Sequence, residues 1–219
     1  YAEALGLFST RDPQFSLRFV QNAALADSGA SYALLCRDKH DALLYPFVLR
    51  DLSGIPELKN CHPGQVLRDT TTPFEYGGIL SSSASAWTRL GNEFLTSLDS
   101  FYAEQGVFSE FIRFNPFLSI PEGMAAHYEI RKTNDSVYID TSRPSEAIVA
   151  QADRSVRKNL RRACDECGLT ISQVTPDSKF IAAFEDLYSS TMRRAKARKY
   201  YYFSSQYYRD LLADSEHVS

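Results

Sequence analysis

The chain has 219 residues, 44% of them hydrophobic, and a formal net charge of −3 at pH 7. Such a chain is long enough for one large domain or two small ones with real hydrophobic cores. Four cysteines do not make a disulfide framework, and no apolar run approaches the roughly 18 residues that would cross a bilayer.

The cysteine usage fits a reducing compartment, and no signal peptide is visible, so we expect a cytoplasmic protein. Because the sequence starts at Tyr1, we also expect that an N-terminal piece has been lost or removed. A zinc site normally needs two close pairs of ligands. Here Cys164 and Cys167 form one C-x-x-C pair without a second, and the four histidines are scattered. We therefore expect no metal site and interpret the cysteines as four small buried thiols, the others being Cys36 and Cys61.

In the first half of the chain, Asp12 and Pro13 predict the start of a helix that ends at Gly29. Two apolar runs, 31–37 and 42–49, flank a polar turn and predict a β-hairpin. Residues 52–83 indicate a long loop with short elements. An apolar stripe then predicts a helix over 85–105, and alternation predicts a strand over 107–114.

The second half predicts short strands over 128–132 and 137–140, and then a helix over 142–168. A strand over 169–174, a long helix over about 178–199 and a shorter helix over about 204–213 follow. Such elements cannot close a core alone. Residues 217–219 are interpreted as the first of a missing strand, and the second domain as truncated.

The helix predicted over 142–168 combines an apolar face with a strongly basic one. Its apolar residues recur every three or four positions, which indicates a buried stripe: Ile148, Ala152, Val156, Leu160, Cys164 and Cys167. Its other face carries Arg154, Arg157, Lys158, Arg161 and Arg162. The charge of the whole chain also becomes more positive toward its second half, where this helix lies. Residues 1–140 hold 11 Lys and Arg against 17 Asp and Glu, whereas residues 141–219 hold 13 against 10. This change of sign favours two domains, with an anionic partner for the second.

In order along the chain, several motifs resemble the Fem-type aminoacyltransferases that build peptidoglycan bridges, and their GNAT-like acyltransferase relatives. The basic helix reads R-K-x-x-R-R-A-x-x-x-G-L, and the next long helix ends in R-x-x-x-Y, at Arg198 and Tyr202. Residues 111–116 are similar to a family strand ending in R-F-x-P, and 69–78 to a family loop ending in Y-G-G. The resemblance covers most of the chain.

The resemblance implies an α/β (α+β) fold of tandem GNAT-like domains, each a mixed sheet flanked by helices. The first domain would span 1–135, and 136–219 would begin an incomplete second one. It also implies transfer of an acyl or aminoacyl group to an amine of a cell-envelope precursor. The donor would be aminoacyl-tRNA or acyl-coenzyme A, with no tightly bound cofactor. No glycine-rich pyrophosphate loop is present, so the donor type stays open and we expect this fragment alone to be inactive.

The candidate substrate-binding residues are Arg198, Tyr202, Arg113, Tyr76, Gly77 and Gly78. Arg198 and Tyr202 would share a helix face, where they would bind the acceptor's diphosphate or an equivalent anion, or else form a solvated helix end. Arg113 would line a cleft or, as we favour, form a salt bridge within its own domain. The glycine pair would contact a ligand or simply form a turn.

The alternative functions are a non-catalytic nucleic-acid-binding module and a scaffold with the same fold. For the first, Arg157, Lys158, Arg161 and Arg162 would contact tRNA phosphates. Against this, helix-surface cations are mostly solvated, and the acidic first half would repel a polyanion. The sequence assigns no catalytic residue and no oligomeric state.

Overall fold

The computed structural model describes residues 1–10, 12–61, 64 and 66–213. Its contacts form two compact units. One consists of Tyr1–Ile130 together with the chain from Pro176 onward, and the other is Arg131–Thr175. The predicted domains, 1–135 and 136–219, stay a prediction. The contacts divide the chain differently, since they group the helices after Pro176 with the N-terminal part of the chain.

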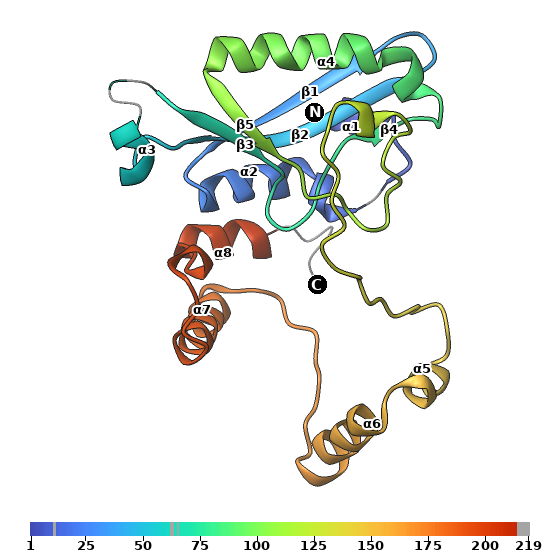
Figure 1. Cartoon of the computed structure of the whole chain (residues 1–219). Helices are drawn as coiled ribbons and strands as arrows, with labels where there is room; N and C mark the ends of the chain where they lie inside the picture. Colours follow the sequence, from blue (N-terminus) through green and yellow to red (C-terminus); the bar gives the residue numbers. More distant parts are fainter. Residues whose placement is uncertain (11, 62–63, 65, 214–219) are drawn as a thin grey trace. The chain divides into compact units, whose positions relative to one another are not determined.

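A mixed five-stranded sheet forms the centre of the first unit (Figure 1). Strands β1 (Ala30–Arg37) and β2 (Ala42–Asp51) form the predicted antiparallel hairpin. Strand β3 (Arg68–Thr71) pairs antiparallel with β2, and β5 (Val107–Phe111) pairs parallel with β3. The short β4 (Leu80–Ser81) pairs with the other end of β2. The prediction of an α/β fold with a mixed sheet flanked by helices is thereby confirmed.

Strand β2 is buried on both faces, as its continuous apolar run requires in a central strand. On one side, β4 pairs with β2 as far as Leu44 and β3 begins its pairing at Val48. Pro46 lies between these two points. Because proline has no N–H to donate, it is tolerated where the strand has a partner on the β1 side only.

Two helices cover the two faces of the sheet (Figure 1). Helix α4 (Ala86–Gln105) forms as predicted and buries Trp87, Phe94 and Leu98 against Tyr45 and Phe47 of β2. It ends at Gly106 in the left-handed conformation. Helix α2 (Leu17–Ala26) lies on the opposite face, where two alanines pack on Val48.

The predicted N-terminal helix over 12–29 forms as two pieces. Asp12 caps a 3-10 turn, η1 (Pro13–Phe15), and Ser16 then caps α2. Gly29 follows α2 at a close approach of two backbones. A Cβ atom there would lie 2.6 Å from the Leu49 carbonyl oxygen, so only glycine fits without a shift.

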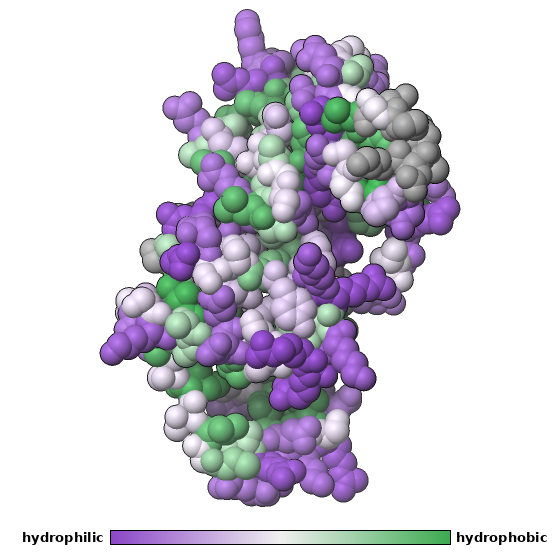
Figure 2. Space-filling view, turned by 90° about the vertical axis from the view of Figure 1, so that its left-hand side faces the viewer, coloured by the Kyte–Doolittle hydropathy of each residue, from purple (hydrophilic) through white to green (hydrophobic). Residues whose placement is uncertain are grey.

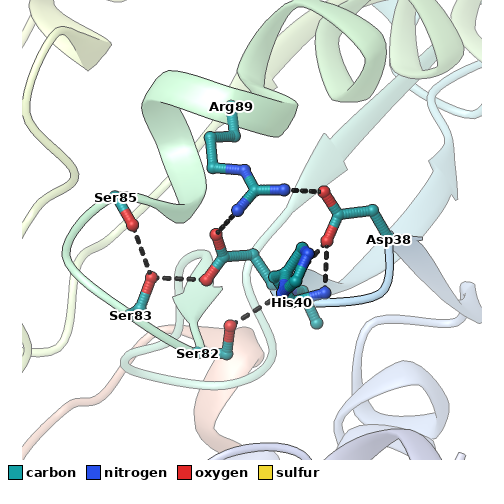
Figure 3. A network of polar contacts seen from close by, with 8 residues as sticks. Asp38, His40, Ser82, Ser83, Ser85 and Arg89 are labelled. Atoms are coloured by element: carbon teal, nitrogen blue, oxygen red, sulfur yellow. Dashed lines mark hydrogen bonds and ion pairs between the residues drawn. The ribbon is translucent and has the colours of Figure 1, made fainter.

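A polar network holds the β1–β2 turn against the start of α4 (Figure 3). The Asp38 carboxylate accepts hydrogen bonds from the backbone N–H groups of His40 and Asp41 at 2.7 and 2.8 Å. The buried Asp41 accepts a hydrogen bond from Ser83 Oγ at 2.5 Å and pairs with Arg89 at 3.3 Å. Arg89 also pairs with Asp38.

The chain after Pro176 packs on α2. Helix α7 (Ser178–Arg194) is followed by the 3-10 turn η4 (Lys199–Tyr201) and by α8 (Ser205–Leu212). Asn22 of α2 donates to the Tyr207 carbonyl of α8 at 3.0 Å. The prediction of a helix continuing to residue 199 is wrong, because Lys196 adopts a left-handed conformation and ends it.

In the second unit, the helix predicted over 142–168 is interrupted. It forms α5 (Ser145–Gln151), α6 (Arg154–Arg161) and a π-helical turn, η3 (Arg162–Glu166). Ala152 and Asp153 adopt extended conformations between the first two. Arg157 of α6 joins the two pieces by donating to the carbonyls of Ala150 and Ala152, at 3.1 and 2.5 Å.

The strands predicted over 128–132, 137–140 and 169–174 do not form among the described residues. The described part of Arg131–Thr175 has no buried residue, so the predicted core-facing stripe is also wrong: Val156 is 46% and Leu160 43% exposed. A strand needs a partner for its backbone groups, and alternation alone supplies none. Figure 2 shows hydrophobic side chains at the surface among hydrophilic ones.

The remaining described elements are short: α1 (Ala2–Leu5), α3 (Pro56–Cys61) and η2 (Met124–Ala126). Among the described helices, none is long and apolar enough to cross a membrane. Cys36 is buried, but Cys164 and Cys167 are exposed, so the prediction of four buried thiols is wrong for these two. His62 and residues 217–219 lie outside the described residues.

Candidate functional site

A pocket of about 540 Å³ lies where the chain after Pro176 meets the loop between β3 and β4. Aromatic rings dominate its lining. The lining residues are Phe74, Glu75, Phe184, Tyr188, Met192, Ala197, Tyr201, Phe203, Tyr207, Tyr208 and Leu211. We call this hollow the aromatic pocket. Its character is typical of sites for ligands with flat or apolar parts.

Helical spacing brings most of these rings together. Phe184 and Tyr188, four residues apart on α7, both make edge contacts with Tyr208 of α8 at 5.7 Å. Phe203 stacks on Tyr207 with ring centroids 4.3 Å apart. Because each ring is held by at least one other, the wall of the pocket is preformed.

Phe74 connects these rings to the N-terminal part of the unit. It stacks on Tyr200 at 5.8 Å and meets the edge of Phe203 at 5.5 Å. Phe74 lies in the loop that continues into Tyr76, Gly77 and Gly78. Residues 69–78 were predicted as a family-like loop with Tyr76, Gly77 and Gly78 as its candidate binding residues, and Phe74 was not among those candidates.

The loop is paired with the segment that follows β5 and carries Arg113. The N–H of Gly77 donates to the Arg113 carbonyl at 2.9 Å, and the N–H of Asn115 donates to the Gly77 carbonyl at 3.0 Å. Gly78 has φ +119°, and a Cβ atom there would lie 3.0 Å from the Phe114 ring. The glycine pair therefore has a structural role that brings the loop and Arg113 together.

Arg113 is exposed and forms no ion pair with any described residue, so the predicted salt bridge is wrong. Its charge acts on Tyr200 instead. Burial and the Asp27 carboxylate raise the pKa of Tyr200, whereas the guanidinium groups of Arg50 and Arg113 oppose that rise. Arg50 is itself engaged by Asp69 through two hydrogen bonds of 2.9 and 2.5 Å. Arg113 is thus a cation without an ion partner among the described residues, and its charge acts on Tyr200.

The tyrosines on α8 are hydrogen-bond donors at neutral pH. Burial raises the pKa of Tyr207 and of Tyr208 to about 12. The Tyr208 side chain is 2% exposed, and its hydroxyl has no hydrogen-bond partner among the described residues. A buried hydroxyl without a hydrogen-bond partner favours a ligand that can form a hydrogen bond with it.

The other predicted residues are less directly involved. Arg198 and Tyr202 flank η4 with extended backbones, so they do not share a helix face as predicted. Both are exposed, and the residues lining the pocket are their neighbours Ala197 and Tyr201. In the sequence, the rings that line the pocket were indicated only by the high aromatic content of 13%.

The basic residues predicted to contact nucleic acid lie in the second unit. All four are exposed: Arg157, Lys158, Arg161 and Arg162. Arg157 is used to join α5 to α6, and Arg162 lies 3.8 Å from Glu166. Lys158 and Arg161 have no ion pair with described residues.

Within the described ranges, no group of three or more His, Cys, Asp or Glu side chains could hold a metal ion. The known proteins give no further guide to the site. None of the protein-family models, curated proteins or solved structures compared with this chain matches it.

Proposed function

We propose that this chain belongs to an acyl- or aminoacyltransferase and that the aromatic pocket holds the acceptor, an anionic cell-envelope precursor bearing an amine. One observation carries the proposal. Two segments singled out for their resemblance to Fem-type transferases, 76–78 and the segment at Arg113, are paired to each other, and a third, 198–202, packs against Phe74. The aromatic pocket adjoins these segments, because Phe74 and Glu75 directly before the first and Tyr201 within the third are among its lining residues.

The pocket lining suits a flat group, but it holds the Glu75 carboxylate and no lysine or arginine, so the acceptor's phosphate would bind Arg113 outside the lining. Stacked rings favour a flat group, and a guanidinium without an ion partner favours phosphate oxygens, which it can bind through two N–H groups. Tyr207 and Tyr208, which stay protonated well above neutral pH, supply hydroxyl donors. The pocket would thus hold the acceptor and leave its amine free to react.

The reaction would be attack by the acceptor amine on the ester of an aminoacyl-tRNA or the thioester of an acyl-coenzyme A. A new amide bond forms, the donor's oxygen or sulfur leaves with the electron pair of the broken bond, and the amine loses a proton. Holding both reactants in line accounts for much of such catalysis. No residue of this chain is assigned as the proton acceptor.

Calorimetric titration with UDP-N-acetylmuramoyl-pentapeptide tests the acceptor site. Arg113→Ala removes the guanidinium and leaves the main-chain pairing with Gly77 intact, so the fold is kept. We expect about tenfold weaker binding, since a charge-assisted hydrogen bond contributes roughly 1.5–3 kcal/mol. Arg37→Ala, which removes another exposed arginine in the same unit, is the matched control.

Equal affinity of the wild type and the Arg113→Ala variant would contradict the proposal, as would the absence of binding by the wild type. Tyr201→Ala, which removes a ring of the pocket lining, separates stacking from charge. It should weaken binding of both UDP and the full precursor, because each would lose the same ring contact.

A second candidate function is nucleic-acid binding by α6, favoured by the exposure of Lys158 and Arg161. Binding of tRNA that weakens steeply with salt, and that is lost in a Lys158→Ala/Arg161→Ala variant, would support it. Salt-independent or undetectable tRNA binding would oppose it.

A further inference from the structure

A second hollow, of about 330 Å³, lies between α4, β5 and residues 127–128. It shares no lining residue with the aromatic pocket, and the proposed function makes no use of it. It is lined by Leu95, Leu98, Asp99, Tyr102, Val107, Phe108, Ser109, Glu110, His127 and Tyr128. We call it the Glu110 pocket.

A half-buried carboxylate with phenol neighbours forms its wall. Tyr102 donates its hydroxyl hydrogen to Glu110 at 2.6 Å, and the Thr70 hydroxyl lies 2.9 Å from the same Tyr102 oxygen. Since Tyr102 donates to Glu110, Thr70 must donate to Tyr102. The Glu110 charge also raises the pKa of the Tyr128 phenol, after the larger effect of burial. Glu110 is therefore held in place by a directed chain of hydroxyl groups.

No lysine or arginine of the described residues forms an ion pair with the carboxylates of this pocket. Neither Glu110 nor Asp99 forms an ion pair with any residue that the structure describes. Both carboxyl groups act on the same phenol, because Asp99 also raises the pKa of Tyr128. His127 is the one basic side chain in the lining, so the two carboxylates face this hollow without a lysine or arginine beside them.

A further phenol lies behind the wall of the pocket. Tyr45 is 0% exposed and is not one of the lining residues. After burial, Glu110 raises the pKa of Tyr45 through its charge and as a side-chain hydrogen-bond acceptor. Phenol groups therefore approach the Glu110 carboxylate both from the buried side and from the lining of the pocket.

We infer that the Glu110 pocket binds a small organic cation, an alkylammonium group. The carboxylates supply opposite charge, and the rings of Tyr102, Phe108 and Tyr128 supply the aromatic surface on which ammonium groups are recognised. An anion would be repelled by both carboxylates. A neutral apolar ligand would displace the water that solvates the carboxylates without supplying hydrogen bonds or opposite charge in its place.

The test is a titration of the chain with choline and with butylammonium, followed by the amide NMR signals of β5 and residues 127–128. Both cations should shift these signals. The neutral isostere of choline, 3,3-dimethylbutan-1-ol, should not. Butylammonium binding more tightly than choline would identify N–H donation to the carboxylates as the main contact, and the reverse order would identify the rings.

Two variants remove the charge with little change of shape. Glu110→Gln should weaken binding of both cations about tenfold, and Asp99→Asn should weaken it several-fold. Because Asp99 is exposed, its variant is expected to fold normally even where Glu110→Gln does not. Glu104→Gln, another exposed carboxylate of α4, is the matched control and should bind as the wild type does.

The inference is overturned if neither cation shifts the signals, if the neutral isostere binds equally well, or if both carboxylate variants keep wild-type affinity. Displacement of choline by magnesium at constant ionic strength would also overturn it, since the site would then prefer a metal ion.

Discussion

Asp41→Ala is expected to destabilise the first unit by about 2 kcal/mol. The Asp41 side chain is 6% exposed and has two partners among the described side chains, the Ser83 hydroxyl at 2.5 Å and an Arg89 guanidinium nitrogen at 3.3 Å. Hydrogen bonds to charged groups contribute roughly 1.5–3 kcal/mol each. The sum must be discounted, because Arg89 is 42% exposed, keeps Asp38 as a partner and can be hydrated after the change.

Urea unfolding followed by circular dichroism measures this loss. Ser83→Ala should cost about 1 kcal/mol, and the double variant should cost less than the sum of the two single ones by about 1 kcal/mol. The reasoning is refuted if Asp41→Ala changes the free energy of unfolding by less than about 0.5 kcal/mol, the range of ordinary surface substitutions.

Three further predictions follow from burial and backbone geometry. Gly29→Ala should lower the free energy of unfolding by about 1–3 kcal/mol because its Cβ would meet Leu49 and Val48, whereas Gly54→Ala, with nothing within 4 Å, should be near neutral in the same urea assay. Burial raises the pKa of Tyr207 and Tyr208 from the ordinary value near 10 to about 12. The stability that their neutral forms contribute is therefore full below about pH 10 and is lost as the pH rises toward 12. Urea unfolding along a pH series should show this fall in the free energy of unfolding, and a flat profile would contradict it. In a Cys61→Ser background, Cys164 and Cys167 should react with a thiol reagent at once and Cys36 only on unfolding, so three equal rates would contradict the assigned burial.

Local patterns in the sequence predicted the first unit well. The β1–β2 hairpin and α4 depend on residues close together in the chain, with alternating or helical periodicity and clear turn signals. The same rules failed for residues 137–140 and 169–174. Ile139 is 65% and Ile171 fully exposed, because periodicity marks a surface suited to burial and does not provide the partner that buries it.

The candidate site was predicted only in its parts. The sequence singled out Arg113 and residues 76–78 separately, and their parallel pairing joins positions more than thirty residues apart, which no local pattern encodes. Arg198 and Tyr202 were assigned to one helix face because the left-handed Lys196 carries no glycine signal. Phe74 was missed because one aromatic residue in a loop has no periodicity to mark it.

The Glu110 pocket had no sequence signal either. Asp99 and Tyr102 lie on α4, Glu110 lies on β5, and Tyr128 follows the turn η2. Their types are common on any protein surface, and only the packing of α4 beside β5 turns them into one acidic, aromatic hollow.

Transfer itself is the most direct test of the central proposal. The assay supplies the natural protein with UDP-N-acetylmuramoyl-pentapeptide and a labelled donor, either aminoacyl-tRNA or acyl-coenzyme A, and follows label on the acceptor amine by mass spectrometry. The account predicts a new amide on that amine with one of the two donors, and a strongly reduced rate for Arg113→Ala at sub-saturating acceptor. Absence of product with both donors, under conditions in which the acceptor binds, would contradict it.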